Sequence, residues 1–233
     1  MMYNKQGDNM LEDFKKLKDE RQVAFVEKLT PCKTPSLGIK IPIIKTYLQS
    51  ISPSYELLDT IPLNEYIEID ILYGLILIKL GKRKDETYNQ YLQLYLDHIN
   101  NWMTCDTFVS NTKYKESELD DLYQLVKQLI QTRDCFKVRV GLVFLKKYFL
   151  KQKNFDEIFH LISTIEYGEY YVDMGCAWLL CTMACMEYEW FSKNIDKIKS
   201  LSPFILKKTI QKMRDSYLIT KEQKELLSKI NSN

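Results

Sequence analysis

The sequence predicts an all-α protein in which short helices follow one another from end to end. Glycine and proline are scarce, with seven Gly and six Pro in 233 residues, against a usual usage of about 7% and 5%. No proline occurs between Pro62 and Pro203. Sheet proteins need many turns, which draw on these two residues, and the apolar residues recur at helical spacing. Together these observations favour helix after helix.

Proline and glycine place the helix boundaries in the first half of the chain. Pro31 ends the first predicted helix, which begins at Met10. Pro42, Pro53 and Pro62 each open a helix, because the missing N–H of proline costs little in a first helical turn. The helix that Pro62 opens ends before a glycine, which suits a C-cap.

Capping residues place the boundaries in the second half. Asn154 and Thr220 each stand three residues before a Glu or Gln, the spacing of a capping box. Ser202 precedes Pro203 as an N-cap precedes the first helical position. In order, the predicted helices cover residues 10–29, 42–50, a short stretch from 53, 62–80, 84–99, 102–111, 116–132, 134–150, 154–165, 169–188, 190–200, 202–217 and 220–230.

About a dozen helices joined by short links do not form one simple bundle. Short links make neighbouring helices antiparallel, so the helices pair. Stacked pairs at about 40 residues per unit describe an α-solenoid of HEAT-like repeats with a concave groove. We expect a single domain of this kind over residues 1–233. The alternative is an irregular helical globule, since no clear sequence repeat is visible.

Composition and cysteine spacing exclude several classes of protein. Six cysteines include no CxxC pair, and Cys181 and Cys185 would share one apolar helix face as small hydrophobes. We therefore expect neither a metal nor another cofactor. No apolar run reaches the roughly 20 residues that span a bilayer, and residues 1–30 hold no signal-type apolar core. We expect a cytoplasmic monomer without a membrane partner.

Charge is uneven although the formal net charge is only +2. Residues 46–78 hold five acidic residues and no Lys or Arg, and we expect the acidic segment 54–70 to face away from the basic groove. Residues 133–153 hold seven basic residues against one acidic residue, and 201–233 hold seven against three. Such stripes either track phosphates or form a solvated face. The candidate phosphate ligands are Arg139, Lys146, Lys153, Lys207, Lys208, Lys212 and Arg214.

Four segments carry a resemblance to a known family. They are Ser36-Leu-Gly-Ile-Lys-Ile-Pro42, Asn101-Trp-Met-Thr-Cys-Asp106, Val138-Arg-Val-Gly-Leu-Val-Phe-Leu-Lys-Lys-Tyr148, and Tyr170-Tyr-Val-Asp-Met-Gly-Cys-Ala-Trp178 followed by 206–217. In order and spacing the chain resembles the bacterial DNA alkylation-repair glycosylases of the HEAT-like AlkD family. The resemblance implies a basic concave face that holds double-stranded DNA, and hydrolysis of the N-glycosidic bond of cationic N3- and N7-alkylpurines.

The resemblance also implies the site residues. The family's Trp and Asp, four residues apart, match Trp102 and Asp106, its Arg matches Arg139, and its second Trp matches Trp178. Asp106 is implied as the group that stabilises an oxocarbenium-like sugar. The two Trp would pack on the deoxyribose and favour its positive charge. Arg139 would hold a neighbouring phosphate.

Two departures from the family pattern keep other functions open. Met103 stands where active members often carry another Trp, and one helix is predicted through Leu29 where members carry two short helices. The main alternative is a non-catalytic HEAT-like DNA-binding scaffold for bent or branched DNA. A third possibility is a protein–protein HEAT adaptor, which would need no basic concave stripe. DNA affinity that falls steeply with salt would separate it from the first two.

Overall fold

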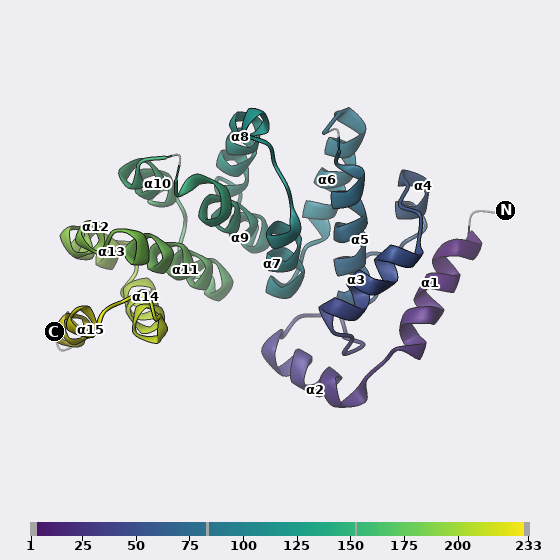
Figure 1. Cartoon of the computed structure of the whole chain (residues 1–233), viewed down its shortest axis with the longest axis horizontal. Coiled ribbons are helices and arrows are strands. Elements are labelled where there is room, and N and C mark those ends of the chain that lie inside the picture. Colours follow the sequence, from purple (N-terminus) through teal and green to yellow (C-terminus); the bar gives the residue numbers. More distant parts are fainter. Residues whose placement is uncertain (1–3, 83, 152, 231–233) are drawn as a thin grey trace. The chain divides into compact units, whose positions relative to one another are not determined.

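The computed structural model describes residues 4–82, 84–151 and 153–230, in which every regular element is a helix and no residue lies in a strand (Figure 1). The elements are α1 (Asn4–Lys16), α2 (Glu20–Leu29), α3 (Ile41–Ser50), α4 (Tyr55–Leu58), α5 (Ile67–Leu80), α6 (Glu86–His98), α7 (Trp102–Asn111), η1 (Glu116–Glu118), α8 (Leu119–Ile130), α9 (Cys135–Phe144), η2 (Leu145–Phe149), α10 (Phe155–Ile162), α11 (Tyr170–Met186), α12 (Tyr188–Lys193), α13 (Ile195–Leu201), α14 (Pro203–Asp215) and α15 (Lys221–Ile230). The predicted all-α fold class is confirmed.

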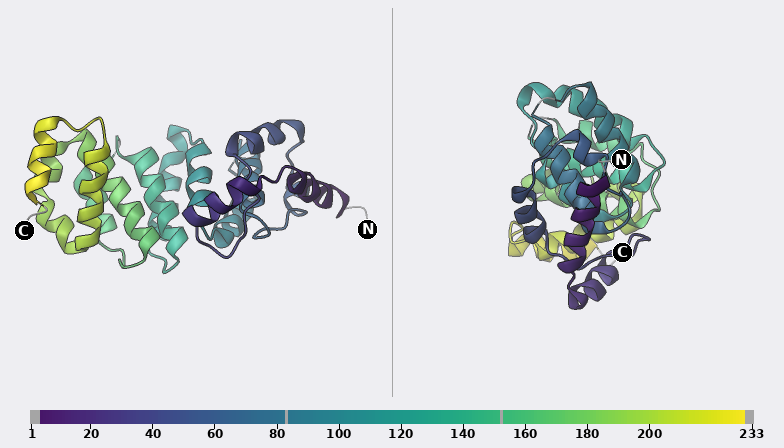
Figure 2. Two further views of the ribbon diagram at one scale, coloured as in Figure 1. Left: turned by 90° about the horizontal axis from the view of Figure 1, so that it is seen from below. Right: turned by 90° about the vertical axis from the view of Figure 1, so that its right-hand side faces the viewer.

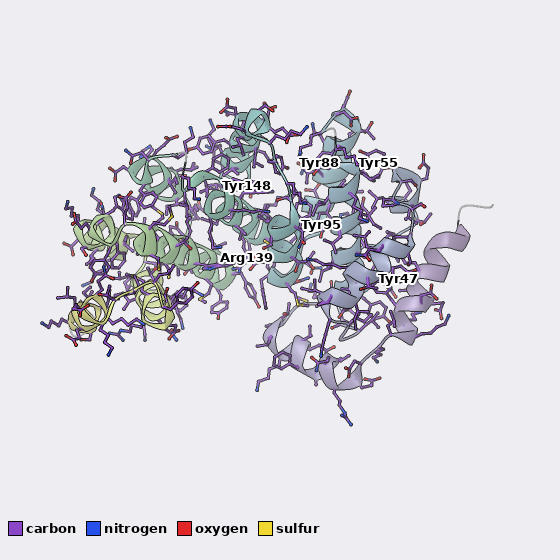
Figure 3. The ribbon with its side chains drawn as sticks, viewed as in Figure 1. Tyr47, Tyr55, Tyr88, Tyr95, Arg139 and Tyr148 are labelled. Atoms are coloured by element: carbon purple, nitrogen blue, oxygen red, sulfur yellow. The ribbon has the colours of Figure 1, made fainter. Side chains whose placement is uncertain are left out.

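The chain divides into two compact units, residues 1–114 and 115–233. In the first unit α5 is the central helix and packs against α3, α4, α6 and α7. Its residues are buried continuously from Ile67 to Leu77, as expected of a helix that is apolar on every side. The most buried side chains around it include Tyr73, Tyr88 and Tyr95, two of which are marked in Figure 3.

In the second unit α11 is the central helix. It packs against α9 on one side and α14 on another, and α8 packs against α9. Figure 2 shows these helices running alongside one another. Gly141 permits the approach of α8, since a Cβ there would lie 2.9 Å from the Ile130 side chain. The stacking of such helix pairs into one HEAT-like solenoid domain over 1–233, with a basic groove, stays a prediction.

The predicted helix over 10–29 is wrong, because α1 and α2 are separate. Asp19 is extended (φ −118°) and its carboxylate accepts a hydrogen bond from Arg21 N–H, so it caps α2. Its own N–H donates to the Leu37 carbonyl at 3.0 Å. Gly38, at φ +72°, lies so close to α2 that any side chain there would collide with its backbone. The chain therefore does carry two short helices here, as the resemblance implies.

The predicted start of the central helix is also wrong, because α5 begins at Ile67 and not at Pro62. Asn64 takes a positive φ of 67° and turns the chain. The Ile67 N–H then donates to the Pro35 carbonyl at 3.0 Å, which fixes the first turn of α5 against the loop before α3. Ser54, and not Pro53, caps the short helix α4.

The predicted helices over 190–200 and 134–150 are each interrupted in the structure. Buried Asn194 separates α12 from α13, and its side-chain amide donates to the Trp190 carbonyl at 2.8 Å. The predicted helix over 134–150 changes to a π-turn at Leu145. Three details are confirmed: the bounds 102–111, the C-cap at Gly81, and the reciprocal Thr220–Gln223 capping box. No helix within the described ranges is long and apolar enough to cross a membrane.

Candidate functional site

Helix α7 presents one accessible face in the first unit. Trp102 and Asp106 are half-buried, while Cys105 and Phe108 are fully buried against the core. Residues four apart lie one above the other on a helix, so the indole and the carboxylate point to the same side. The pairing predicted for Trp102 and Asp106 is therefore present as a local geometry of α7.

The first turn of α7 is held at two places. Asn101 is the N-cap, and its Oδ1 accepts a hydrogen bond from the Thr104 N–H at 2.9 Å. The Trp102 indole N–H donates to the Leu29 carbonyl at the end of α2, at 3.0 Å. The indole therefore joins two helices that are 73 residues apart in sequence. Its orientation is set by a structural hydrogen bond.

Two carboxyl groups of the acidic stretch lie inside the first unit, beneath this region. Glu68 is fully buried, and its carboxylate accepts hydrogen bonds from Ser36 Oγ at 2.7 Å, Leu37 N at 2.9 Å and Ile39 N at 3.2 Å. It thereby fixes the turn before α3. Asp70 is 2% exposed, and burial raises its pKa to about 7, against the lowering by its bond from Asn64 N–H. The negative charge of Glu68 contributes a smaller part of this rise in the pKa of Asp70.

A seam between α9 and α11 gathers three predicted site residues in the second unit. Arg139 is 6% exposed, and its Nη1 donates to the Tyr171 carbonyl at 2.8 Å, across the seam (Figure 3). Gly175, one turn further along α11, lies against the same side chain, since a Cβ there would be in ordinary van der Waals contact with Arg139 Cγ and Nη1, at 3.6 Å. The guanidinium is thus largely buried by contact with the first two turns of α11.

The other two predicted site residues of the seam, Lys146 and Trp178, form a cation–π contact. Lys146 Nζ lies over the Trp178 ring, 3.8 Å from its centroid. Tyr171, Gly175 and Trp178 are four and three residues apart, so they form one stripe of α11. Lys146 belongs to the π-turn η2 at the end of α9; such turns are rare and often occur at functional sites. The structure therefore brings Arg139, Lys146 and Trp178 together along one line.

The remaining basic candidates lie in several places. Lys153 makes an ion pair with Glu157 at 3.5 Å and lies over the Tyr123 ring, so it contacts α10 and α8. Arg214 Nη2 donates to the Leu227 carbonyl of α15 at 3.1 Å. Lys207 lines a pocket of about 540 Å³ that also contains α13 residues. Lys212 is half-buried. Its positive charge lowers the pKa of Cys181 of α11, against the larger rise that burial causes.

Lys208 is the α14 residue whose contacts lead back to the seam. Its Nζ lies over the Phe204 ring, 5.6 Å from the centroid. The Phe204 ring is 6.2 Å from that of Tyr170, which in turn contacts Tyr171, the residue bound by Arg139. Tyr170 is 55% exposed. The pair Tyr170-Tyr171 at the start of α11 is the sequence feature that could have indicated this aromatic cluster. Sequence reasoning used this pair only as part of a family motif.

Sequence reasoning also missed the asparagines beside α7. Asn100 and Asn101 precede a helix, where Asn is a favoured cap, and that signal was available. No group of three or more His, Cys, Asp or Glu among the described residues could hold a metal ion. The chemistry available to the two sites is therefore that of a carboxylate and an indole on α7, and of cations and aromatic rings on the α9–α11 seam.

A comparison with known protein families finds one that covers both helices α7 and α11. The sequence model of the family described as DNA alkylation repair enzyme matches residues 10–213, which is most of the chain. No curated protein is similar enough to count as a relative. The matched range contains α7 and the α9–α11 seam, with Trp102, Asp106, Arg139, Lys146 and Trp178, and it ends one residue before Arg214. The chain belongs to the family of DNA alkylation repair enzymes.

Proposed function

We propose that the protein is a DNA glycosylase that hydrolyses the N-glycosidic bond of cationic N3- and N7-alkylpurines in duplex DNA. The observation that carries the proposal is the accessible face of α7, on which Trp102 and Asp106 stand one turn apart. The family membership supplies the substrate, which is alkylated DNA.

The substrate's charge explains why a carboxylate suffices. An N3- or N7-alkylpurine is already cationic, so it leaves as a neutral base without a general acid. Positive charge then develops on the sugar, as in an oxocarbenium-like transition state. Asp106 would stabilise that charge and position the attacking water. Trp102 would pack beside the sugar in the orientation that its bond to Leu29 fixes.

The α9–α11 seam would hold the DNA and contribute a second aromatic wall. The face of Trp178 already accepts a cation, since Lys146 Nζ lies 3.8 Å from its ring centroid. A ring that stabilises an ammonium group in this way is also suited to a cationic sugar or purine. Arg139 supplies a fixed positive charge at the seam, and Lys146 and Lys208 supply cations closer to solvent for phosphates.

A non-catalytic DNA-binding scaffold is the second candidate, and one observation favours it. The Trp102 N–H is used by the Leu29 carbonyl, and Arg139 is 6% exposed, so both residues also have structural roles. A scaffold would bind duplex DNA through the basic residues and release no base. A salt-insensitive interaction with DNA would exclude both candidates and favour the protein–protein adaptor.

The test is release of free base from methylated duplex DNA by the purified protein, followed over time in a single turnover. We expect release of N7-methylguanine and N3-methyladenine, and no release of uracil from a matched duplex, because uracil leaves as an anion and needs further stabilisation. Duplex binding without any release of alkylated base would replace the glycosylase by the scaffold.

A further inference from the structure

A chain of side-chain amides connects the interior of the first unit to the helix that carries Trp102 and Asp106. Asp70 Oδ1 accepts a hydrogen bond from the Asn64 N–H at 2.7 Å. Asn64 Oδ1 accepts from Asn100 Nδ2 at 2.8 Å, and Asn100 Oδ1 accepts from Asn101 Nδ2 at 3.0 Å. Asn101 Oδ1 then caps α7 by accepting from the Thr104 N–H.

The backbone N–H of Thr104 fixes the direction of this chain at its α7 end. The Thr104 N–H can only donate, so Asn101 must present its oxygen to α7 and its amide nitrogen to Asn100. Asn100 therefore turns its own nitrogen towards Asn64 and towards Thr34, whose Oγ1 lies 2.7 Å away. Each amide thus has one orientation that satisfies its neighbours.

Two features of this hydrogen-bonded chain are energetically unfavourable, and both lie at its Asp70 end. Asp70 Oδ2 is a buried oxygen without a hydrogen-bond partner among the described residues. Asn64 lies at φ 67°, in the left-handed region that non-glycine residues rarely adopt. Unpartnered buried groups and strained backbone tend to accumulate where a functional geometry is held in place. Both costs lie at the end of the chain that anchors it to α5.

We propose that Asn100 and Asn101, held by Asn64 and Asp70, are positioning residues that fix the first turn of α7 and so aim Trp102 and Asp106. Neither asparagine would touch the DNA. This inference rests on the proposed glycosylase function for its effect on rate, and the positioning itself is measurable without catalysis.

The variants Asn101→Ser and Asn100→Ala separate positioning from stability. Serine keeps an acceptor for the Thr104 N–H, so the cap remains while the link to Asn100 is cut. Asn100→Ala removes the link and leaves the cap intact. Asn111→Ala is the matched control, because its amide donates to the Thr107 carbonyl at the other end of the same helix.

We expect single-turnover release of N7-methylguanine to fall about tenfold or more in both variants, because small displacements of a reacting group cost up to about 10²-fold. Duplex affinity and the unfolding temperature should stay close to those of the wild-type protein. A merely structural role would lower the unfolding temperature and leave the rate unchanged. Rates in both variants equal to that of Asn111→Ala would overturn the proposal.

A spectroscopic measurement distinguishes this failure from failure of the proposed function. In a Trp178→Phe, Trp190→Phe background, Trp102 is the remaining tryptophan. Adding Asn100→Ala or Asn101→Ser should shift its emission and increase its quenching by acrylamide, with no such change for Asn111→Ala. If the wild-type protein releases no base, the glycosylase proposal fails, and this shift alone decides the positioning proposal. An unchanged Trp102 signal would then overturn it.

Discussion

The first turn of α7 and the α9–α11 seam are built by opposite means. Around α7, neutral amides and a backbone carbonyl hold the turn that carries Trp102, through bonds of 2.8 to 3.0 Å. On the seam, cations lie against rings and a carbonyl, as Lys146 does over Trp178 and Arg139 does at Tyr171. Hydrogen bonds between neutral groups are directional and fix the orientation of the first turn of α7. A lysine over a neutral ring can instead move to an anion such as a phosphate. In the proposed function, α7 would therefore set the reacting geometry and the seam would bind the phosphates.

The largest expected effect comes from the carboxylate on α7. Asp106→Asn should lower single-turnover release of alkylated base by about 10²–10³-fold, because loss of one electrostatic partner of the transition state typically costs that much. Duplex affinity should change little, since the interaction develops only as the bond breaks. Asp97→Asn, an exposed aspartate on α6, is the control. Excision that survives in Asp106→Asn would remove this residue from the mechanism and leave the seam to explain catalysis.

The next effect concerns the buried end of the amide chain. Burial raises the folded-state pKa of Asp70 from 3.8 to about 7, so the folded protein keeps this proton at pH values where the unfolded chain has lost it. Stability should therefore fall as pH rises from about 4 to about 7, by at most about 1.4 kcal/mol per pH unit. Asp70→Asn should remove that slope and make the protein more stable than the wild type at pH 8.

Urea unfolding of both proteins between pH 5 and pH 8 measures this difference. Asp121→Asn, an exposed aspartate on α8, should retain the wild-type slope. If the free energy of unfolding depends on pH in the same way in Asp70→Asn and in the wild type, burial does not raise the pKa of Asp70 in the folded protein.

The seam should respond to the loss of its buried cation through stability. Arg139→Met removes the donor of the Tyr171 carbonyl, which is held by the largely buried guanidinium. A hydrogen bond that involves a charged group contributes about 1.5–3 kcal/mol, so the unfolding temperature should fall and duplex affinity with it. Arg133→Met, which changes an exposed arginine, should unfold at the wild-type temperature. Equal unfolding temperatures would show that Arg139 is not needed to hold the start of α11.

Sequence reasoning was more successful for elements than for their junctions. The scarcity of Gly and Pro predicted helices throughout, and the bounds 102–111 predicted for α7 are those of the structure. The break at Asp19 and the late start of α5 were missed because both depend on distant partners, the Leu37 and Pro35 carbonyls. Arg139 and Trp178 were correctly predicted to lie in helices, but the burial of Arg139 depends on the facing helix, where its Nη1 donates to the Tyr171 carbonyl. Local patterns do not contain such contacts.

The smallest expected effect belongs to the mobile charge of the seam. Lys146→Met keeps the length of the side chain and removes the cation that lies 3.8 Å from the Trp178 ring centroid. A contact of this kind is worth about 0.5–1 kcal/mol at an accessible site, so unfolding should change little. If Lys146 moves to a phosphate when DNA binds, the log–log slope of affinity against salt should fall by about one. Lys147→Met, one residue along the same π-turn, should leave the emission of Trp178 unchanged where Lys146→Met shifts it. A slope that stays at the wild-type value in Lys146→Met would mean that this lysine remains on the ring, and that the seam, like α7, is a fixed geometry.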